Sequence, residues 1–248
     1  MNAMQRDAEE EPLDVLIVGA GLSGIGAASY LTRELPRKSF AILEARGDLG
    51  GTWDLFRYPG IRSDSDLFTF GFEFKPWRSR KAIADAPDIL AYLREAAAEC
   101  GADRKIRYHH KVIRADWDSR AALWTVTAHR ADVGAETTIR ARWLFCATGY
   151  YDYDSGYSPP FRGAEDFRGT LIHPQHWPAG FDHAGKKIAV IGSGATAVTL
   201  VPALAATAAH VTQIQRTPTY VMSLPSRDAL ADLFRRLLPE ARAHAAAR

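Results

Sequence analysis

Residues 13–24 read Leu13-Asp-Val-Leu-Ile-Val-Gly-Ala-Gly-Leu-Ser-Gly24, and this stretch decides the fold of the chain. Its first six residues form a near-continuous apolar run, which predicts a buried strand. The glycines follow at the spacing G-x-G-x-x-G, and small residues at 26–29 continue into a predicted helix that ends at Leu35, before Pro36. A strand, a glycine-rich turn and a helix in this order are typical of a Rossmann-like α/β domain that binds a dinucleotide.

Each glycine of that turn has a physical task. Gly19 permits the tight turn, Gly21 lets backbone N–H groups approach a pyrophosphate, and Gly24 allows the helix to pack closely on the strand. A second strand, Phe40 to Glu44, ends in a carboxylate that can accept hydrogen bonds from ribose hydroxyls. The predicted residues of this first site are Gly19, Gly21, Ser23, Gly24 and Glu44.

A second glycine-rich loop repeats the pattern, with a predicted strand from Lys187 to Ile191 before it and alanine as its third small residue. We expect Val198 to open the helix proper and Pro202 to disturb its regularity. The next strand, Val211 to Gln215, is followed by a base where the first site has an acid. A guanidinium there can pair with the 2′-phosphate of NADP, although a solvated strand-end cation is the alternative. The acid after the first loop and the base after the second predict FAD in the first site and NADPH in the second. The predicted NADP-binding residues are Gly192, Ser193, Gly194, Ala195, Thr196, Ala197, Val198, Arg216 and Thr217.

Between the loops, apolar residues at helical spacing predict one helix over Ala84 to Cys100. Alternating residues then predict short strands, with a turn at 132–134. Their ranges are Ile106 to Tyr108, Lys111 to Trp117, Leu123 to His129 and Thr137 to Phe145. His109 and His110 are adjacent and would face opposite sides of a strand, so we expect no metal site.

The composition of the chain indicates which classes of binding partner it has. The 248 residues are 47% hydrophobic and 24% charged, with a net charge of +2 and no basic block, which disfavours nucleic acid and membrane surfaces as partners and favours small molecules. Residues 1–12 are polar and acidic without an apolar core, which predicts a disordered tail and no secretory signal. No window reaches about 18 apolar residues, so we expect no transmembrane segment and a cytoplasmic protein. Cys100 and Cys146 are far apart, which disfavours a flavin–disulfide redox centre.

Two further motifs carry the function. Residues 167–178 read Phe-Arg-Gly-Thr-Leu-Ile-His-Pro-Gln-His-Trp-Pro, the pattern F-x-G-x-x-x-H-x-x-x-W-P, and residues 50–66 read GGTWDLFRYPGIRSDSD. Taken alone, the second stretch is as consistent with an ordinary surface loop as with a site. Taken singly, Phe167 and Trp177 favour core anchors, and His173 favours a hydrogen-bonded linker residue. Together with the two loops, these motifs resemble the Baeyer–Villiger branch of flavin monooxygenases, from Leu13 to the end of the chain.

The resemblance implies roles for particular residues. The G-G-T-W segment would wrap FAD, the backbone around Val112 would lie near the adenine, and Asp64 would be the catalytic carboxylate at the junction of flavin and nicotinamide, positioning an arginine. Arg62 and Ser63 would lie near NADP. The FAD contacts implied in this way are Thr52, Trp53, Asp54, Leu55, Asp64 and Val112. The pattern at 167–178 would couple movement of the NADPH domain to the flavin through Phe167, Gly169, His173, Trp177 and Pro178.

The resemblance also implies the reaction and the domain organisation. An enzyme of this kind uses NADPH and O2 to insert one oxygen into a ketone or a sulfur through a C4a-peroxyflavin. We expect an FAD domain at 13–150 with an inserted β-meander, a linker at 151–185 and the first part of an NADPH domain at 186–248. The arginine and the C-terminal return of the FAD domain would lie beyond residue 248, so we expect an N-terminal fragment that is inactive or needs the missing half. The alternatives are a flavin N-hydroxylase or other heteroatom oxygenase, and a non-catalytic dinucleotide-binding module.

Overall fold

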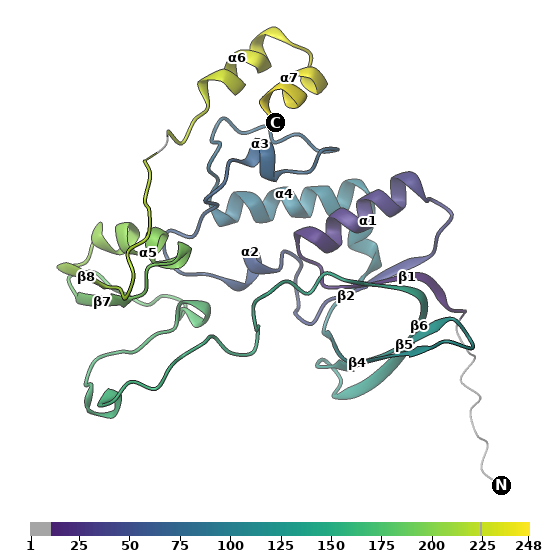
Figure 1. Ribbon diagram of the computed structural model, residues 1–248, viewed down its shortest axis with the longest axis horizontal. Helices are drawn as coiled ribbons and strands as arrows, with labels where there is room; N and C mark the ends of the chain where they lie inside the picture. The colour runs from purple at the N-terminus through teal and green to yellow at the C-terminus, as the bar shows by residue number, and fades with distance from the viewer. Residues whose placement is uncertain (1–10, 224) are drawn as a thin grey trace. The chain divides into compact units, whose positions relative to one another are not determined.

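The computed structural model describes residues 11–223 and 225–248, and these residues belong to two compact units (Figure 1). The first unit comprises Met1–Gly51 and Leu93–Tyr150, and the second comprises Thr52–Tyr92 and Tyr151–Arg248. All but the last two residues of the tail predicted at 1–12 lie outside the described residues.

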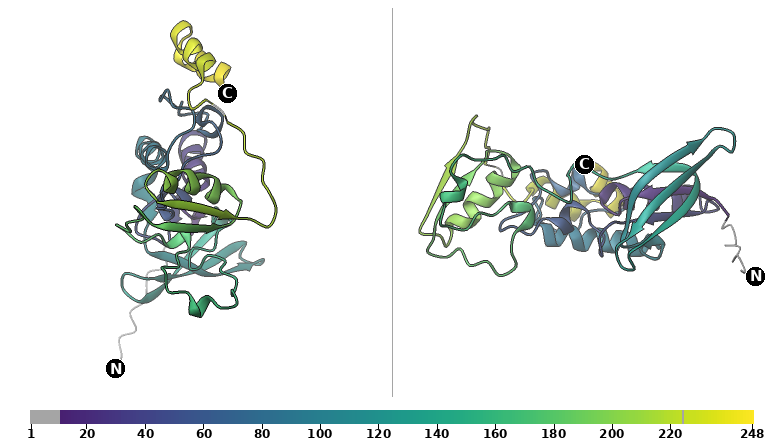
Figure 2. Two further views of the ribbon diagram at one scale, coloured as in Figure 1. Left: turned by 90° about the vertical axis from the view of Figure 1, so that its left-hand side faces the viewer. Right: turned by 90° about the horizontal axis from the view of Figure 1, so that it is seen from below.

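The first unit is built on a six-stranded sheet in the order β3-β2-β1-β6-β5-β4. Strands β1 (Leu13–Val18), β2 (Phe40–Leu43) and β3 (Ile106–Arg107) are parallel, and β4 (His110–Asp118), β5 (Leu123–Arg130) and β6 (Ala135–Cys146) form an antiparallel meander (Figure 2). The twelve residues of β6 serve both parts, because the strand pairs with β5 up to Ala141 and with β1 from Ala141 to Cys146. The predicted α/β fold with its meander is therefore confirmed.

Helix α1 (Leu22–Glu34) turns Ile25 and Ala28 into the core and ends just before Leu35, as the sequence predicts. Helix α4 (Ala86–Glu99) buries the apolar residues whose spacing predicts it, and a short helical turn, η1 (Ala102–Lys105), follows. The core below the meander combines small and branched side chains on neighbouring strands. Its buried members are Leu16, Ala41, Leu43, Val126, Ala128, Ile139 and Ala141.

The second unit contains two parallel strands, β7 (Lys187–Ile191) and β8 (His210–Ile214), joined by α5 (Ala195–Ala205). Its other helices are α2 (Thr52–Leu55), α3 (Leu67–Phe70), α6 (Ala229–Leu237), α7 (Glu240–Ala247) and the short turns η2 (Ala164–Asp166) and η3 (Pro174–His176). Leu55, Phe56 and Tyr58 are buried in one apolar cluster with Leu200 and Leu204 of α5.

The structure differs from the sequence prediction at three local elements. Helix α5 begins at Ala195, three residues before Val198, because the loop ends at Gly194 and the small residues after it already adopt the helix. Pro202 lies inside that helix, which continues to Ala205. Residues 52–55 and 67–70 each form a single helical turn, too short for an apolar period to reveal it.

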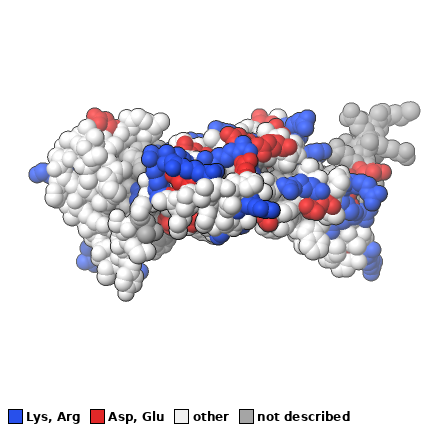
Figure 3. All heavy atoms as spheres, turned by 90° about the horizontal axis from the view of Figure 1, so that it is seen from above, with Lys and Arg blue, Asp and Glu red and all other residues white. Residues whose placement is uncertain are grey.

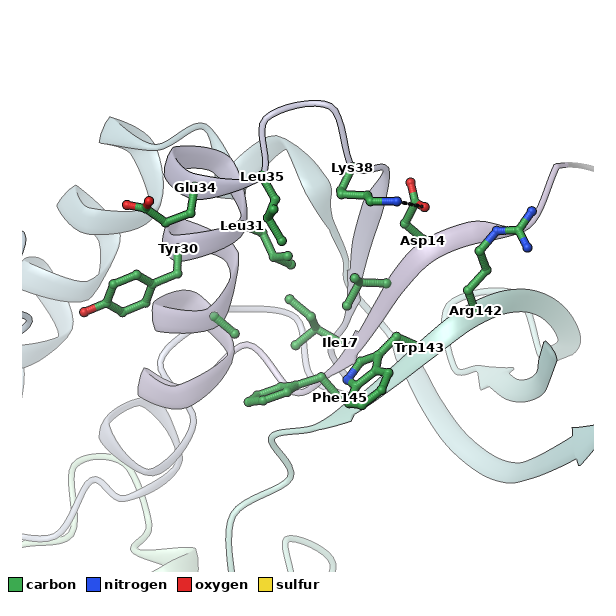
Figure 4. A pocket seen from close by; sticks show the side chains of 12 residues that line it. Asp14, Ile17, Tyr30, Leu31, Glu34, Leu35, Lys38, Arg142, Trp143 and Phe145 are labelled. Carbon is green, nitrogen blue, oxygen red and sulfur yellow. Dashed lines mark hydrogen bonds and ion pairs between the residues drawn. The ribbon is translucent and has the colours of Figure 1, made fainter. Parts of the chain in front are cut away.

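The meander leaves part of β6 uncovered. Trp143 is 64% exposed, and with Phe145 and residues of α1 it lines an apolar cavity of about 520 Å³ (Figure 4). No strand among the described residues pairs with β6 beyond Ala141 on the side that β5 occupies. The first unit thus has an exposed apolar surface and an open strand edge beside the second half of β6.

Charged side chains of both signs are mixed on the face drawn in Figure 3, in agreement with a net charge of only +2. Within the described part of the chain, no helix is long and apolar enough to cross a membrane.

Candidate dinucleotide-binding site

The first glycine-rich loop and Glu44 emerge at the same end of two neighbouring parallel strands, since Val18 is paired with Leu43. Gly19 has a φ of +105°, and a Cβ there would lie 2.5 Å from the Ala147 carbonyl oxygen. A Cβ on Gly24 would overlap the Gly19 carbonyl oxygen. Both positions therefore require glycine, for the turn and for the close helix–strand approach that the spacing predicts.

Glycine also leaves the start of α1 open. Gly21 is the residue before the first helical turn, and it has no side chain to occupy the N–H groups of that turn. Ser23 follows in the same turn and is exposed to solvent. Helix N–H groups and the positive end of the helix dipole are well suited to bind phosphate oxygens.

The Glu44 carboxylate is 4% exposed and is held by the backbone of the loop itself. Oε2 accepts the Ala20 N–H at 2.8 Å, and Oε1 accepts the Arg46 N–H at 3.0 Å. Each carboxylate oxygen has a further lone pair, so these bonds leave capacity for ribose hydroxyls. Sequence reasoning predicted only the ribose contact and missed that Glu44 fixes the loop.

The second loop has the same arrangement in the second unit. Ile191 is paired with Ile214, so the residues after β7 and those after β8 lie at one end of the strand pair. Gly192 has a φ of +140°, its N–H donates to the Ile214 carbonyl at 2.8 Å, and its carbonyl accepts Nε2 of Gln213 at 2.9 Å. Gly194 precedes α5, and an added Cβ at either glycine would meet no described atom within 4 Å. The loop backbone is thus open on its outer side.

The basic residue predicted to read the 2′-phosphate is placed accordingly. Arg216 and Thr217 are exposed and follow β8 by two and three residues, at the strand end from which the Gly192 loop leaves. Within the loop, Ser193 and Thr196 bring hydroxyl groups and the alanines keep the surroundings small. The structure therefore brings the predicted second-loop residues together.

The residues of the G-G-T-W segment are ordered by packing within the second unit. Asp54 is buried and forms an ion pair with Arg57, and Leu55 lies in the apolar cluster with α5. The Trp53 ring contacts Phe70 edge to face at 6.1 Å, and Thr52 begins α2. Their contacts with FAD remain a prediction.

Asp64 and its neighbours differ in whether their side chains are free to contact a ligand. Asp64 is exposed, and its Oδ1 accepts a long 3.5 Å hydrogen bond from the Ser65 hydroxyl. Ser63 is buried, and its hydroxyl donates to the Ser65 carbonyl at 2.7 Å within the turn. Arg62 forms an isolated β-bridge with Asp85. The Asp64 carboxylate, to which the resemblance gives the catalytic role, is therefore accessible to solvent. The Ser63 hydroxyl is instead engaged in a hydrogen bond within the turn.

The Tyr58-Pro59-Gly60 turn packs directly on α5. Gly60 has a φ of +79°, and a Cβ there would lie 2.6 Å from the Thr199 carbonyl oxygen and 2.7 Å from the Ala203 Cβ. The Thr199 hydroxyl also lies 3.4 Å from the Tyr58 hydroxyl. The glycine of this motif is thus needed because the turn touches the helix that follows the second nucleotide loop.

The pattern at 167–178 is partly buried. Trp177 packs against the second unit's apolar cluster, as expected of a core anchor, but Phe167 is 60% exposed, so a core role for it is wrong. A Cβ on Gly169 would overlap the Phe167 ring, which lies over this glycine on a surface loop. Nδ1 of His173 accepts the Gln175 N–H at 3.2 Å, so His173 is a hydrogen-bonded linker histidine. Pro178 follows Trp177 and is exposed.

Val112 belongs to the predicted set, whereas His109 and Gln175 lie outside it. Val112 packs on the first unit's core opposite Ala128, which leaves its predicted backbone contact with adenine untested. His109 adopts a left-handed conformation with φ of 60°, and its ring lies on Gly47, beside the Glu44 segment. No sequence pattern signals this conformation, nor the burial of Gln175. No cluster of metal-ligating side chains occurs in the ranges that the structure describes.

With this geometry established, comparison with known proteins identifies the family. The model of the pyridine nucleotide-disulphide oxidoreductases matches residues 13–237. The chain belongs to this family. Its two cysteines, Cys100 and Cys146, are free thiols far apart in sequence, so the chain has the family's nucleotide-binding fold without a C-x-x-C pair.

Individual relatives show which members of the family this chain resembles. The FAD-containing monooxygenase EthA of Mycobacterium tuberculosis is 57% identical over 239 residues, which cover 96% of this chain and 48% of EthA. An oxidized steroid monooxygenase bound to NADP superimposes with a TM-score of 0.75 at 32% identity, covering 88% of this chain and 42% of that one. A cyclohexanone-bound cyclohexanone monooxygenase superimposes with a TM-score of 0.74 at 30% identity, and the match covers 85% of this chain and 40% of that one. The resemblance to Baeyer–Villiger monooxygenases is confirmed, and the chain spans about half the length of the curated relatives it matches.

Proposed function

We propose that this chain provides the two dinucleotide sites of an FAD- and NADPH-dependent monooxygenase of the Baeyer–Villiger type. The observation that carries the proposal is the order of its parts. The F-x-G-x-x-x-H-x-x-x-W-P segment lies between two open glycine-rich loops, in a chain 57% identical to an FAD-containing monooxygenase. Because the chain spans about half of such relatives, the whole activity is proposed for a form that includes the other half.

The first loop fits the pyrophosphate and ribose of FAD. Gly19 and Gly24 bring the strand and helix close together, Gly21 leaves the first N–H groups of α1 open, and Glu44 holds the loop while retaining lone pairs for ribose hydroxyls. When bound, FAD would supply the oxygen-activating chemistry and NADPH the reducing hydride. The chain's residues would bind and orient both cofactors and exclude water around them.

The second loop fits a phosphorylated dinucleotide. The open backbone at Gly192 and Gly194 suits the pyrophosphate, and the exposed Arg216 guanidinium suits the 2′-phosphate that distinguishes NADP from NAD. A carboxylate at this position would instead favour NAD. The steroid monooxygenase, which superimposes on this chain, binds NADP, and this supports the assignment.

Asp64 supports the chemical step through its exposed carboxylate. That group is available to pair with and orient an arginine, which the resemblance places in the other half of the relatives. The substrates we propose are ketones and soft sulfur compounds, and the relative solved with cyclohexanone supports the first class. We also propose that the protein acts in the cytoplasm, with small-molecule partners and no nucleic acid.

The test measures bound flavin, NADPH oxidation and products from cyclohexanone and a thioamide. It compares this chain with a version extended by the corresponding C-terminal half of a relative. We expect turnover to lactone or S-oxide only in the extended protein. Product from the 248-residue chain alone would show that the other half is unnecessary.

A variant pair tests the residue assignment in the extended protein. Asp64→Asn is expected to keep flavin and NADPH binding but to lose product formation. The control, Asp116→Asn, removes an exposed carboxylate of the meander that pairs with Arg114, and it should retain activity. Hydroxylation of an amine without ketone oxidation would favour a flavin N-hydroxylase, and cofactor binding without NADPH consumption would favour a non-catalytic module.

A further inference from the structure

A buried glutamine inside the 167–178 segment ties that segment to a distant part of the linker. Gln175 is 5% exposed, and its side-chain Nε2 donates to the Asp152 carbonyl at 2.7 Å. A buried amide that makes so short a bond contributes more than the space it fills, because without the bond the buried Nε2 would lose this partner. Gln175 occupies a variable position of the motif, so the pattern itself gives it no role.

The same short region fixes the His173 ring from two sides. Nδ1 of His173 accepts the backbone N–H of Gln175 at 3.2 Å. On another side the ring lies against Gly156, where any Cβ would overlap the ring atoms. Because Nδ1 is an acceptor in this arrangement, the ring proton of the neutral imidazole is on Nε2.

These contacts close the base of a long loop. Tyr153 and Trp177 both pack against the second unit's apolar cluster, and the Asp152–Gln175 bond lies next to both anchors. The chain between them contains Phe161, Phe167 and Leu171, all exposed. A single bond that joins residues 23 apart limits how far the closed loop can move.

We propose that Gln175 is a positioning residue that holds His173 in one ring orientation and one tautomer by tethering residues 152–156 beneath it. The four residues Asp152, Gly156, His173 and Gln175 are called the linker latch. The further step, that the linker latch sets the coupling of NADPH oxidation to oxygenation, rests on the proposed function. The latch geometry itself does not.

The first experiment needs no turnover and uses the whole 248-residue chain. Selective 15N-histidine labelling reports the His173 ring nitrogens at pH 8, with the His173 signals assigned from a His173→Gln sample. Hydrogen exchange reports the residue-175 amide and the 157–172 loop. Gln175→Met keeps the length and volume of the side chain but removes the donor. We expect both His173 tautomers to appear in this variant, and exchange at residue 175 and in the loop to become about tenfold faster.

Two comparisons make the result specific. Glu165→Gln changes an exposed side chain of the same loop and should leave the His173 signals and the exchange rates as in the wild type. Gly156→Ala keeps Gln175 but inserts a Cβ where the ring lies, and it should change the His173 tautomer signals if the latch is real. Wild-type His173 signals and exchange rates in Gln175→Met would overturn the proposal, whatever Gly156→Ala shows. Should Gln175→Met fail to fold, as judged from its amide spectrum, Gly156→Ala alone decides.

The second experiment uses the extended protein. There Gln175→Met is expected to raise the share of consumed NADPH that appears as hydrogen peroxide, with little change in KM for NADPH. If Gln175→Met alters the His173 signals but leaves the share of NADPH lost as hydrogen peroxide unchanged, the linker latch exists but does not set the coupling of NADPH oxidation to oxygenation. Absence of any NADPH oxidation in the wild type would instead refute the proposed function.

Discussion

The Glu44 carboxylate accepts the Ala20 N–H at 2.8 Å, so the acid after the second strand holds the middle of the first glycine-rich loop. Its second oxygen accepts the Arg46 N–H at 3.0 Å, and the side chain is almost wholly buried. A residue expected to read the cofactor therefore also builds the site, because the loop N–H is satisfied by a charged acceptor before any ligand binds.

Replacing Glu44 by Gln tests this double role. The amide can accept only one of the two N–H bonds and turns its NH2 group toward the other donor, so we expect a loss of about 1.5–3 kcal/mol in the free energy of FAD binding, about 10- to 100-fold in Kd. The thermal midpoint without FAD should also fall. Fluorescence titration with FAD and thermal denaturation measure the two effects. Glu34→Gln, an exposed carboxylate on α1, is the control. A fall in FAD affinity with an unchanged thermal midpoint would mean that Glu44 only contacts ribose.

Gly60→Ala tests the contact between the Tyr58-Pro59-Gly60 turn and α5. An alanine would be strained at φ +79° and would press its Cβ against the Thr199 carbonyl, so we expect a destabilisation of about 3 kcal/mol. Gly134→Ala is the matched control, because Gly134 has φ +66° and no described atom within 4 Å of an added Cβ. That variant should lose only about 1 kcal/mol. Denaturant unfolding measures both, and equal losses would show that the α5 contact contributes nothing.

The sequence pattern predicted where the strands lie better than it predicted which strands pair with one another. The apolar run before Gly19 and the alternation at 137–145 each identify a strand within about two residues of its observed bounds. Nothing in that alternation reveals that β6 pairs with β5 over one half and with β1 over the other. Periodicity depends on which faces of a strand are buried, not on which strand provides each hydrogen bond.

The candidate site likewise contains residues that the sequence predicts and contacts that it does not. Gly19, Gly24 and Gly192 were predictable because a tight turn and a close helix approach demand glycine at fixed local spacing. The Tyr58–Thr199 contact joins residues 141 apart, and the Gln175–Asp152 bond depends on burial of a residue type usually exposed. Such contacts follow from how distant segments meet, which one sequence without its fold does not report.

Asp14 provides a test of local electrostatics in the first unit. Lys38 Nζ donates to its Oδ1 at 2.9 Å and Ser39 donates to its Oδ2, and these bonds lower the pKa of Asp14 from 3.8 to about 2. A carboxyl whose folded pKa is depressed stabilises the fold above its unfolded pKa, and this contribution is lost as the pH falls through about 2. Lys38→Met should raise the pKa of Asp14 toward 3.8, while the Ser39 donors keep it below that value. Carboxyl 13C NMR between pH 5 and pH 2 measures the shift. Lys187→Met, an exposed lysine elsewhere, should not move it.

Arg216→Ala tests how the second site distinguishes its nucleotides. Arg216 follows β8 at the strand end from which the Gly192 loop leaves, and its guanidinium could form charge-assisted hydrogen bonds with a 2′-phosphate there but would have no such partner on NAD. Calorimetric titration of the chain should therefore show NADP⁺ binding weakened about 10- to 100-fold and NAD⁺ binding unchanged, so that NAD⁺ serves as the control ligand. Arg216→Lys should lose less than Arg216→Ala, because the ammonium keeps the charge without the bidentate geometry. If both nucleotides weaken equally, Arg216 supports the loop without reading the phosphate. If neither weakens, it is a solvated strand-end cation.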